Sequence, residues 1–185
     1  MVALPEQVLA AKELLFNKNK KMKHLYILLL LLSTTIFSQT KKFDKLLKRN
    51  LQKTVPVLTV SEVENSQDFL FFDAREEKEF KTSHLKNAKQ VGYDFFDLEE
   101  ILAEYPDKTK PILVYCSIGI RSEHIGEKLM KAGYTDVYNL YGGIFEWKNQ
   151  SKEVVDENEK PTEKVHTFSK EWSKWLLKGE KVYEK

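Results

Sequence analysis

The single cysteine of the chain, Cys116, lies where an apolar run ends and a helical pattern begins, in the stretch ILVYCSIGIRSEHIGEKLM (Ile112–Met130). Parallel strands present their ligand sites at their carboxyl ends. A loop at such an end turns its backbone N–H groups toward a common centre, and the following helix adds the partial positive charge of its N-terminus. We therefore expect Cys116 to be held as a thiolate and to act as a nucleophile.

Three residues after the cysteine support this interpretation. Gly119 allows a positive φ, Arg121 supplies a fixed positive charge, and Ser122 is a good N-cap for the following helix. The alternative is a buried structural cysteine, which is common at the end of a core strand. Because all three residues stand at the positions that such a loop requires, they favour the functional interpretation. The expected binding loop consists of Ser117, Ile118, Gly119, Ile120, Arg121 and Ser122.

Short apolar runs alternate with segments of helical periodicity along the middle of the chain. This alternation predicts an α/β fold with a mostly parallel sheet. The apolar runs are DFLFFDAR (68–75), KPILVYC (110–116) and DVYNLYGG (136–143).

Segments of different character flank this middle part. Residues 39–54 predict a linker or short helix, because apolar residues at helical spacing alternate there with lysines. Residues 151–164 form a polar, acidic connector. Residues 165–185 carry aromatic and leucine side chains at helical spacing, which predicts a helix docked on the domain. The residues of this stripe are Phe168, Trp172, Trp175 and Leu176.

Residues 22–38 have the proportions of a secretory signal peptide. Lysines precede an apolar run of 13 residues, Leu25–Phe37, which is shorter than the roughly 20 residues of a spanning helix. We expect cleavage near Ser38 and Gln39, export to the periplasm or beyond, and no membrane span afterwards. The alternative is an uncleaved membrane anchor. Because a signal peptide of normal proportions would begin at Met22, we expect residues 1–21 to be either a start site assigned too early or a cytoplasmic extension.

Charge and cysteine content exclude several other functions. Five of the 30 basic and two of the 28 acidic residues lie in residues 1–38, so the rest of the chain carries 25 basic and 26 acidic residues. This balance gives no electrostatic basis for nucleic-acid binding. A single cysteine excludes an intramolecular disulfide and a CxxC redox pair. We expect no metal and no cofactor, because the sequence has no His/Cys ligand cluster and no glycine-rich phosphate loop.

Four motifs follow one another along the chain: DAREEKEF (73–80), SHLKNA (83–88), CSIGIRS (116–122) and LYGGIFEW (140–147). Together they make the chain similar to the single-domain rhodaneses, sulfurtransferases whose cysteine carries a persulfide. The resemblance covers roughly residues 57–147. The second motif departs from the family, because Ser83, Lys86 and Asn87 replace two glycines and a proline.

The resemblance implies a rhodanese-like three-layer fold over residues 55–150, with a central, mostly parallel five-stranded sheet and helices on both faces. It makes Cys116 the sulfur acceptor, surrounded by loop amides, and Arg121 the arginine that closes the loop. Asp73 and Arg75 stand at a neighbouring strand end. We expect them to support the loop and set its charge, as a structural ion pair rather than as substrate contacts.

The resemblance, together with the predicted signal peptide, therefore implies an exported sulfurtransferase. A thiosulfate-like or persulfide donor would load Cys116, and a thiol or cyanide would accept the sulfur. The side chains of Ser117, Ile118 and Ile120 make the loop neutral and apolar beside Arg121, which leaves selection of the dianion thiosulfate open. The oligomeric state also stays open.

Two other functions are alternatives. A non-catalytic rhodanese-like binding or sulfur-holding module of the cell envelope would show no activity that depends on Cys116. A cysteine phosphatase or arsenate reductase of related fold uses a Cys-x5-Arg loop that fits a tetrahedral phosphate. This chain has Cys-x4-Arg, from Cys116 to Arg121, a length that fits one transferred sulfur atom.

Overall fold

The computed structural model describes residues 18, 22–23, 39–65 and 69–183. The chain divides into two units between Phe43 and Asp44. Residues 39–43 are helical in the first unit, and residues 44–50 are helical in the second. Most of the expected signal peptide lies outside the described residues. Within the described ranges, no helix combines the length and the apolar content that crossing a membrane requires.

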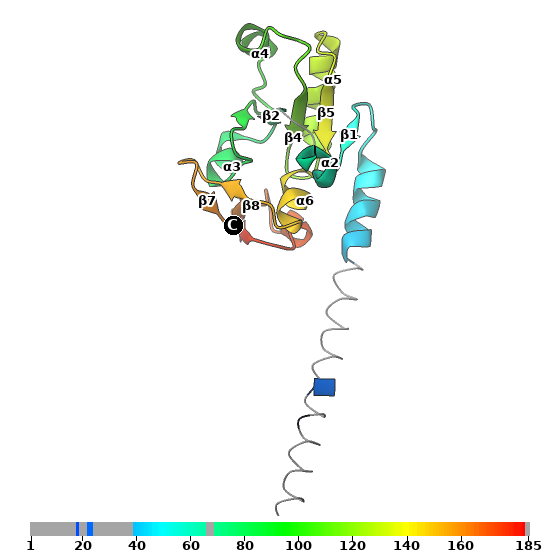
Figure 1. The fold of residues 1–185 in the computed structure, drawn as a ribbon, viewed down its shortest axis with the longest axis vertical. Helices are drawn as coiled ribbons and strands as arrows, with labels where there is room; N and C mark the ends of the chain where they lie inside the picture. The colour runs from blue at the N-terminus through cyan, green and yellow to red at the C-terminus, as the bar shows by residue number, and fades with distance from the viewer. Residues whose placement is uncertain (1–17, 19–21, 24–38, 66–68, 184–185) are drawn as a thin grey trace, which may run out of the picture. The chain divides into compact units, whose positions relative to one another are not determined.

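A five-stranded sheet forms the centre of the second unit (Figure 1). All its strand pairs are parallel, which confirms the predicted α/β fold. All four residues of the central strand are buried, as expected for a strand covered on both faces. The strands lie in the order β1 (Val57–Leu58), β5 (Val137–Leu140), β4 (Ile112–Tyr115), β2 (Leu70–Asp73) and β3 (Lys89–Gln90).

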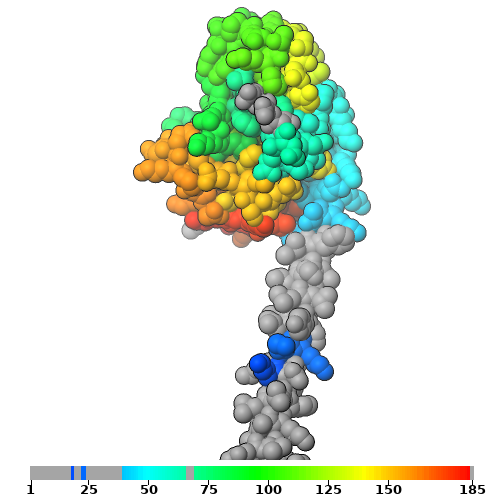
Figure 2. Space-filling model, in the orientation of Figure 1, coloured from blue at the N-terminus to red at the C-terminus, as the bar shows by residue number. Residues whose placement is uncertain are grey.

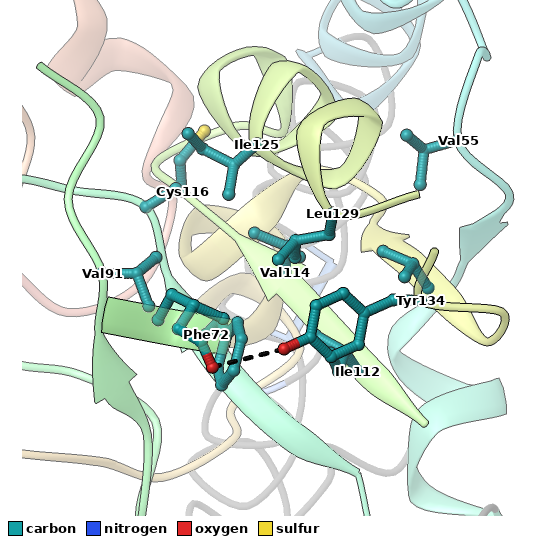
Figure 3. Close-up of a cluster of buried hydrophobic side chains, with 12 residues drawn as sticks. Val55, Phe72, Val91, Ile112, Val114, Cys116, Ile125, Leu129 and Tyr134 are labelled. Atoms are coloured by element: carbon teal, nitrogen blue, oxygen red, sulfur yellow. Dashed lines mark hydrogen bonds between the residues drawn. The ribbon is translucent and has the colours of Figure 1, made fainter. Parts of the chain in front are cut away.

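Helices lie on both faces of this sheet. Ile112 and Val114 of β4 belong to a buried apolar cluster with Ile125 and Leu129 (Figure 3). Leu113, between them, is equally buried and points to the opposite face, because side chains alternate along a strand. The helices are α2 (Val60–Glu64), α3 (Glu77–Thr82), α4 (Leu98–Glu104), α5 (Ile120–Lys131) and α6 (Gly143–Asn149).

The chain after α6 differs from the sequence prediction. We expected a polar connector over 151–164 and a docked helix over 165–185. The structure has an antiparallel pair in the first region and a parallel pair that spans the second. Figure 2 shows these residues, in orange and red, gathered at one end of the unit. The elements are β6 (Val154–Val155), β7 (Pro161–Thr162), β8 (Lys164–His166), the 3-10 helix η1 (Trp172–Trp175) and β9 (Glu180–Val182).

Backbone geometry explains why residues 165–185 do not form one helix. Phe168 and Gly179 have φ values of 62° and 95°, which a continuous right-handed helix cannot contain. The two ends of the segment pair with each other, and the N–H of Thr167 donates to the carbonyl of Val182 over 2.7 Å. The apolar stripe is also not one face, because Leu176 is fully buried while Phe168 is 59% exposed. Strand pairing here overrides the helical spacing of the sequence.

Candidate active site

Cys116 lies directly after β4, at the carboxyl end of the central strand. Its side chain is buried, its thiol is free, and it belongs to the apolar cluster that also contains Val91 and Ile125 (Figure 3). The chain then turns through three residues into α5, which begins at Ile120. The cysteine therefore lies at the carboxyl end of a strand, as its position in the sequence predicted, and it is buried between an apolar core and the backbone of the loop.

Gly119 forms the turn that faces the sulfur. Its φ is 106°, in the left-handed region that favours glycine, so the predicted need for a positive φ here is confirmed. Its N–H donates to Sγ of Cys116 over 3.1 Å. Gly119 is also the N-cap residue of α5, and the partial positive charge of a helix N-terminus stabilises a nearby anion. The sulfur is thus placed as a hydrogen-bond acceptor in a region that favours negative charge.

Ser122 does not cap α5, so that prediction is wrong. The helix begins two residues earlier, and Ser122 is buried in its first turn. The hydroxyl of Ser122 donates to Oδ1 of Asn139 over 2.8 Å, and Nδ2 of Asn139 donates to the carbonyl of Gly119 over 2.9 Å. Asn139 in β5, which the sequence analysis did not single out, therefore ties the loop and the start of α5 to the sheet.

The N-terminus of α6 holds the back of the loop. The N–H of Ile144 donates to the carbonyl of Cys116 over 2.9 Å, and the N–H of Phe145 donates to the carbonyl of Ser117 over 3.2 Å. In a planar trans peptide the carbonyl and the following N–H point in opposite directions. These two bonds therefore direct the N–H groups of Ser117 and Ile118 away from α6.

This contact depends on Gly143, the second glycine of the LYGGIFEW motif. A Cβ at residue 143 would lie 2.2 Å from the carbonyl oxygen of Cys116 and 2.8 Å from the nitrogen of Ile118. No side chain larger than a hydrogen atom fits at these distances. The glycine is required because two backbone segments touch here.

Glu79 in α3 fixes the polar end of the loop, although the sequence analysis gave it no role. Arg121 donates from Nη1 to Oε2 of Glu79 over 2.7 Å and from Nη2 to Oε1 over 2.8 Å. The hydroxyl of Ser117 donates to Oε1 of the same carboxylate over 3.1 Å. Such two-point pairing is both strong and directional. Glu79 stands in the first motif, but only the placement of α3 shows which loop its carboxylate reaches.

The buried Glu79–Arg121 pair decides the charge of the site. Burial raises the pKa of Glu79, but the hydrogen bonds and the charge of Arg121 outweigh burial and hold this pKa below its usual value. Burial lowers the pKa of Arg121, whereas the hydrogen bonds and the charge of Glu79 contribute to raising it above its usual value. Both groups stay ionised. The positive charge expected at Arg121 is therefore present but is balanced by a carboxylate.

Asp73 and Arg75 form a second buried ion pair, with both side chains fully covered. Nη2 of Arg75 donates to Oδ2 of Asp73 and to the carbonyl of Ser83, each over 2.6 Å. The hydrogen bond from Arg75 to Ser83 thus stabilises the turn after α3 and not the cysteine loop. We had expected Asp73 and Arg75 to support the cysteine loop directly, whereas the structural ion pair between them is as expected. Arg75 still affects the site electrostatically, because its charge helps to lower the pKa of Glu79.

A cavity of about 220 Å³ opens beside the cysteine loop. Its lining combines this loop with two aromatic residues from the segment between β8 and β9, which the sequence analysis assigned to a docked helix. In the described ranges, no group of His, Cys, Asp or Glu side chains is arranged to hold a metal ion. The lining residues are Cys116, Ser117, Ile118, Ile120, Arg121, Phe168 and Trp172.

These features define a class of protein: a parallel α/β domain that presents one cysteine in a short backbone loop at the end of its central strand. The rhodanese-like domain family matches residues 41–150, and the chain belongs to this family. The match starts before the expected domain boundary at residue 55 and ends before β6. Strands β6 to β9, with Phe168 and Trp172, therefore lie beyond the matched part.

Similar proteins include sulfurtransferases. The chain is 33% identical over 98 residues to the thiosulfate sulfurtransferase GlpE of Coxiella burnetii, which covers 53% of this chain and 89% of that protein. It is 34% identical over 97 residues, 51% of this chain, to the tRNA uridine(34) hydroxylase of Yersinia pestis, but the match spans only 27% of the hydroxylase. A solved thiosulfate sulfurtransferase from Pseudomonas aeruginosa superposes with a TM-score of 0.50 at 27% identity, over 55% of this chain and 20% of that one. The chain is thus a rhodanese-like protein of the sulfurtransferase family.

We expect Gly143→Ala to destabilise the domain more than the matched variant Gly133→Ala. Both glycines have positive φ, but a Cβ at residue 133 would meet only the side chain of Lys108 at 3.5 Å, whereas at residue 143 it would meet the carbonyl of Cys116 at 2.2 Å. Both variants lose stability because alanine disfavours positive φ. The movement that relieves the overlap at residue 143 should lower the free energy of unfolding of Gly143→Ala by roughly 1–3 kcal/mol more. Urea unfolding of both variants measures the difference. Equal losses would show that the loop can move away from α6 without cost.

Glu79→Gln should lower the free energy of unfolding at pH 7 by roughly 3 kcal/mol, because Arg121 would be left in a mostly buried position without its counter-charge. Glu77→Gln on the same helix, which removes an exposed pair with Lys81, is the control and should cost much less. The fold lowers the pKa of Glu79 below its usual value of 4.5. The ionised carboxylate therefore stabilises the folded protein fully above pH 4.5, and this contribution to the free energy of unfolding is lost as the pH falls through the lowered pKa. Glu79→Gln should therefore lose less stability than the wild type between pH 5 and pH 3. Identical pH slopes would contradict this role.

Proposed function

We propose that the protein is a sulfurtransferase that carries the transferred sulfur as a persulfide on Cys116. The observation that carries this proposal is the hydrogen bond from the N–H of Gly119 to Sγ of Cys116, at the N-terminus of α5. The relatives named thiosulfate sulfurtransferase support the same chemistry. A sulfur anion at this position is stabilised without any metal or cofactor.

The reaction has two steps with the same geometry. The Cys116 thiolate attacks the outer sulfur of a donor, the S–S bond of the donor breaks, and the leaving group departs with the electron pair, as sulfite in the case of thiosulfate. The new outer sulfur extends beyond Sγ, where the N–H groups of Ser117 and Ile118 can stabilise its charge. Cyanide or a thiol then attacks this sulfur, and the thiolate of Cys116 is regenerated. No oxidant or reductant is consumed.

Two features disfavour the phosphatase alternative. The loop contains four residues between Cys116 and Arg121, one fewer than the phosphatase loop. Arg121 already donates to the carboxylate of Glu79 and to the hydroxyl of Ser117, so its charge is balanced and only two of the five N–H groups of a guanidinium remain for the oxygens of a phosphate ester. Transfer of a single sulfur atom needs neither the longer loop nor a free arginine.

Intact-mass measurement tests the sulfur-transfer proposal. We expect the purified protein to gain one sulfur atom from thiosulfate or from inorganic polysulfide, and to lose it to cyanide as thiocyanate. Cys116→Ser is the control and should show no gain, since the chain has no other thiol. A wild-type protein that no donor loads, although an alkylating reagent shows that Cys116 is reduced, would favour the non-catalytic module. Hydrolysis of a chromogenic phosphate ester should be absent.

We also propose that the protein is exported to the periplasm or an equivalent compartment, with its signal peptide removed. The support is the sequence of residues 22–38, in which a basic segment and a short apolar run precede Ser38. An exported sulfurtransferase would act on sulfur compounds of the cell envelope.

Fractionation of cells that express the full chain tests export. We expect a soluble envelope protein whose mass corresponds to a start at Gln39, because a 13-residue apolar run is too short to remain as a span. Leu29→Arg with Leu30→Arg should keep the chain uncleaved inside the cell, because charges in the apolar run block its insertion. An unprocessed chain that stays in the membrane fraction would instead establish the anchored form.

A further inference from the structure

We propose that Phe168 and Trp172 form a specificity wall of the Cys116 cavity and select sulfur donors with an apolar organic body over thiosulfate. The donor class is an organic thiosulfonate or persulfide, in which a hydrocarbon group is bound next to the transferable sulfur. This inference rests on the proposed sulfurtransferase function and names the substrate class of the same site.

The wall comes from a part of the chain that the family match does not include. The match ends at residue 150, and the two aromatic residues lie between β8 and β9. They line the cavity together with Ile118 and Ile120 of the loop. The four side chains together give an open cavity beside the sulfur a largely apolar lining. The volume of about 220 Å³ is below the roughly 300 Å³ of drug-sized sites, so the cavity suits one small hydrocarbon or aromatic group.

The charge of the cavity disfavours a dianion. Arg121 is the charged side chain among the described residues that line it, and Glu79 balances this charge through two hydrogen bonds. The ring of Phe168 lies 5.7 Å from the guanidinium carbon of Arg121, a distance at which an aromatic face attracts and covers a cation. Thiosulfate would lose its hydration here without gaining an unbalanced positive charge. A donor with an apolar body loses less hydration and gains from burial.

The wall is held in place by specific contacts. Phe168 has a φ of 62°, an unusual conformation for an aromatic residue, of the kind that persists where surrounding structure enforces it. The N–H of Phe168 donates to Nδ1 of His166 over 3.2 Å. Burial lowers the pKa of His166, which favours the neutral ring that can accept this bond. His166 is thus a positioning residue for the wall.

One side chain of α6, that of Asn149, anchors the far end of the same segment. Nδ2 of Asn149 donates to the carbonyl of Trp175 over 3.0 Å, and the N–H of Leu177 donates to Oδ1 of Asn149 over 2.6 Å. Leu176 is fully buried between these two contacts. The same helix therefore fixes the cysteine loop through its N-terminus, and through its C-terminal turn it fixes residues 175–177, which follow the wall in the chain.

Loading rates with two related donors test the wall. Benzenethiosulfonate and methanethiosulfonate both release a sulfinate and differ in their apolar body. We expect the ratio of their kcat/KM values for loading Cys116 to fall about tenfold in Phe168→Asn and in Trp172→Ala, because the variants lose apolar contacts to the phenyl group. Asparagine is chosen at residue 168 because it tolerates positive φ. Phe95→Ala is the control, since Phe95 is 88% exposed and lies outside this cavity.

In each loading step the Cys116 thiolate bonds to the outer sulfur, the bond between the two sulfurs of the donor breaks, and the sulfinate leaves with the electron pair. Wild-type protein should load faster from benzenethiosulfonate than from thiosulfate. A higher rate with thiosulfate would overturn the inference. An unchanged donor ratio in both variants, with unfolding curves that show they are folded, would also overturn it.

A binding measurement separates the failure of this inference from the failure of the proposed function. Cys116→Ser cannot be loaded, but its cavity should bind benzenesulfinate, and Phe168→Asn in this background should weaken binding about tenfold. If no donor loads the wild type while this binding and its loss are observed, the sulfurtransferase proposal fails and the aromatic wall stands as a ligand site. If polysulfide loads Cys116 but benzenesulfinate binding does not depend on Phe168, the wall is wrong and sulfur transfer stands.

Discussion

The two hydrogen bonds from the N-terminus of α6 to the carbonyls of Cys116 and Ser117 are the constraint on which the rest of the site depends. They fix the orientation of two peptide planes and so direct the following N–H groups away from α6. The contact is possible only because residue 143 has no Cβ. A glycine in one motif thereby sets the geometry of a cysteine in another. The helix that presents this glycine also anchors the segment that carries Phe168 and Trp172.

The Glu79–Arg121 pair completes the loop on its polar side and makes its charge nearly neutral. A site whose arginine is free attracts oxyanions from solution, whereas here the stabilisation of an anion is left to backbone N–H groups and a helix terminus. Such groups act over short distances, so they favour charge on the sulfur itself more than charge on distant oxygens. The same distinction therefore supports both proposals, the transfer of a single sulfur atom and the preference for a donor with an apolar body.

The sequence was sufficient to predict the parallel sheet and the position of Cys116, because buried strands and strand-end loops leave local patterns. It was not sufficient for Glu79, whose role depends on where α3 places this carboxylate beside the cysteine loop, or for Asn139, which looks like any other polar residue in a short strand. The C-terminal segment was predicted wrongly for a related reason. The spacing of Phe168, Trp172 and Leu176 is helical, but the pairing of β8 with β9 is a long-range event that leaves no periodic signal.

The central claim is that the loop amides hold a sulfur atom bonded to Cys116. A crystal structure of the protein after treatment with inorganic polysulfide tests it most directly. The expected result is a second sulfur on Sγ that lies in the cavity, within hydrogen-bond distance of the N–H groups of residues 117–119. An unmodified thiol after treatment, or an added sulfur that points away from these N–H groups, would contradict the account.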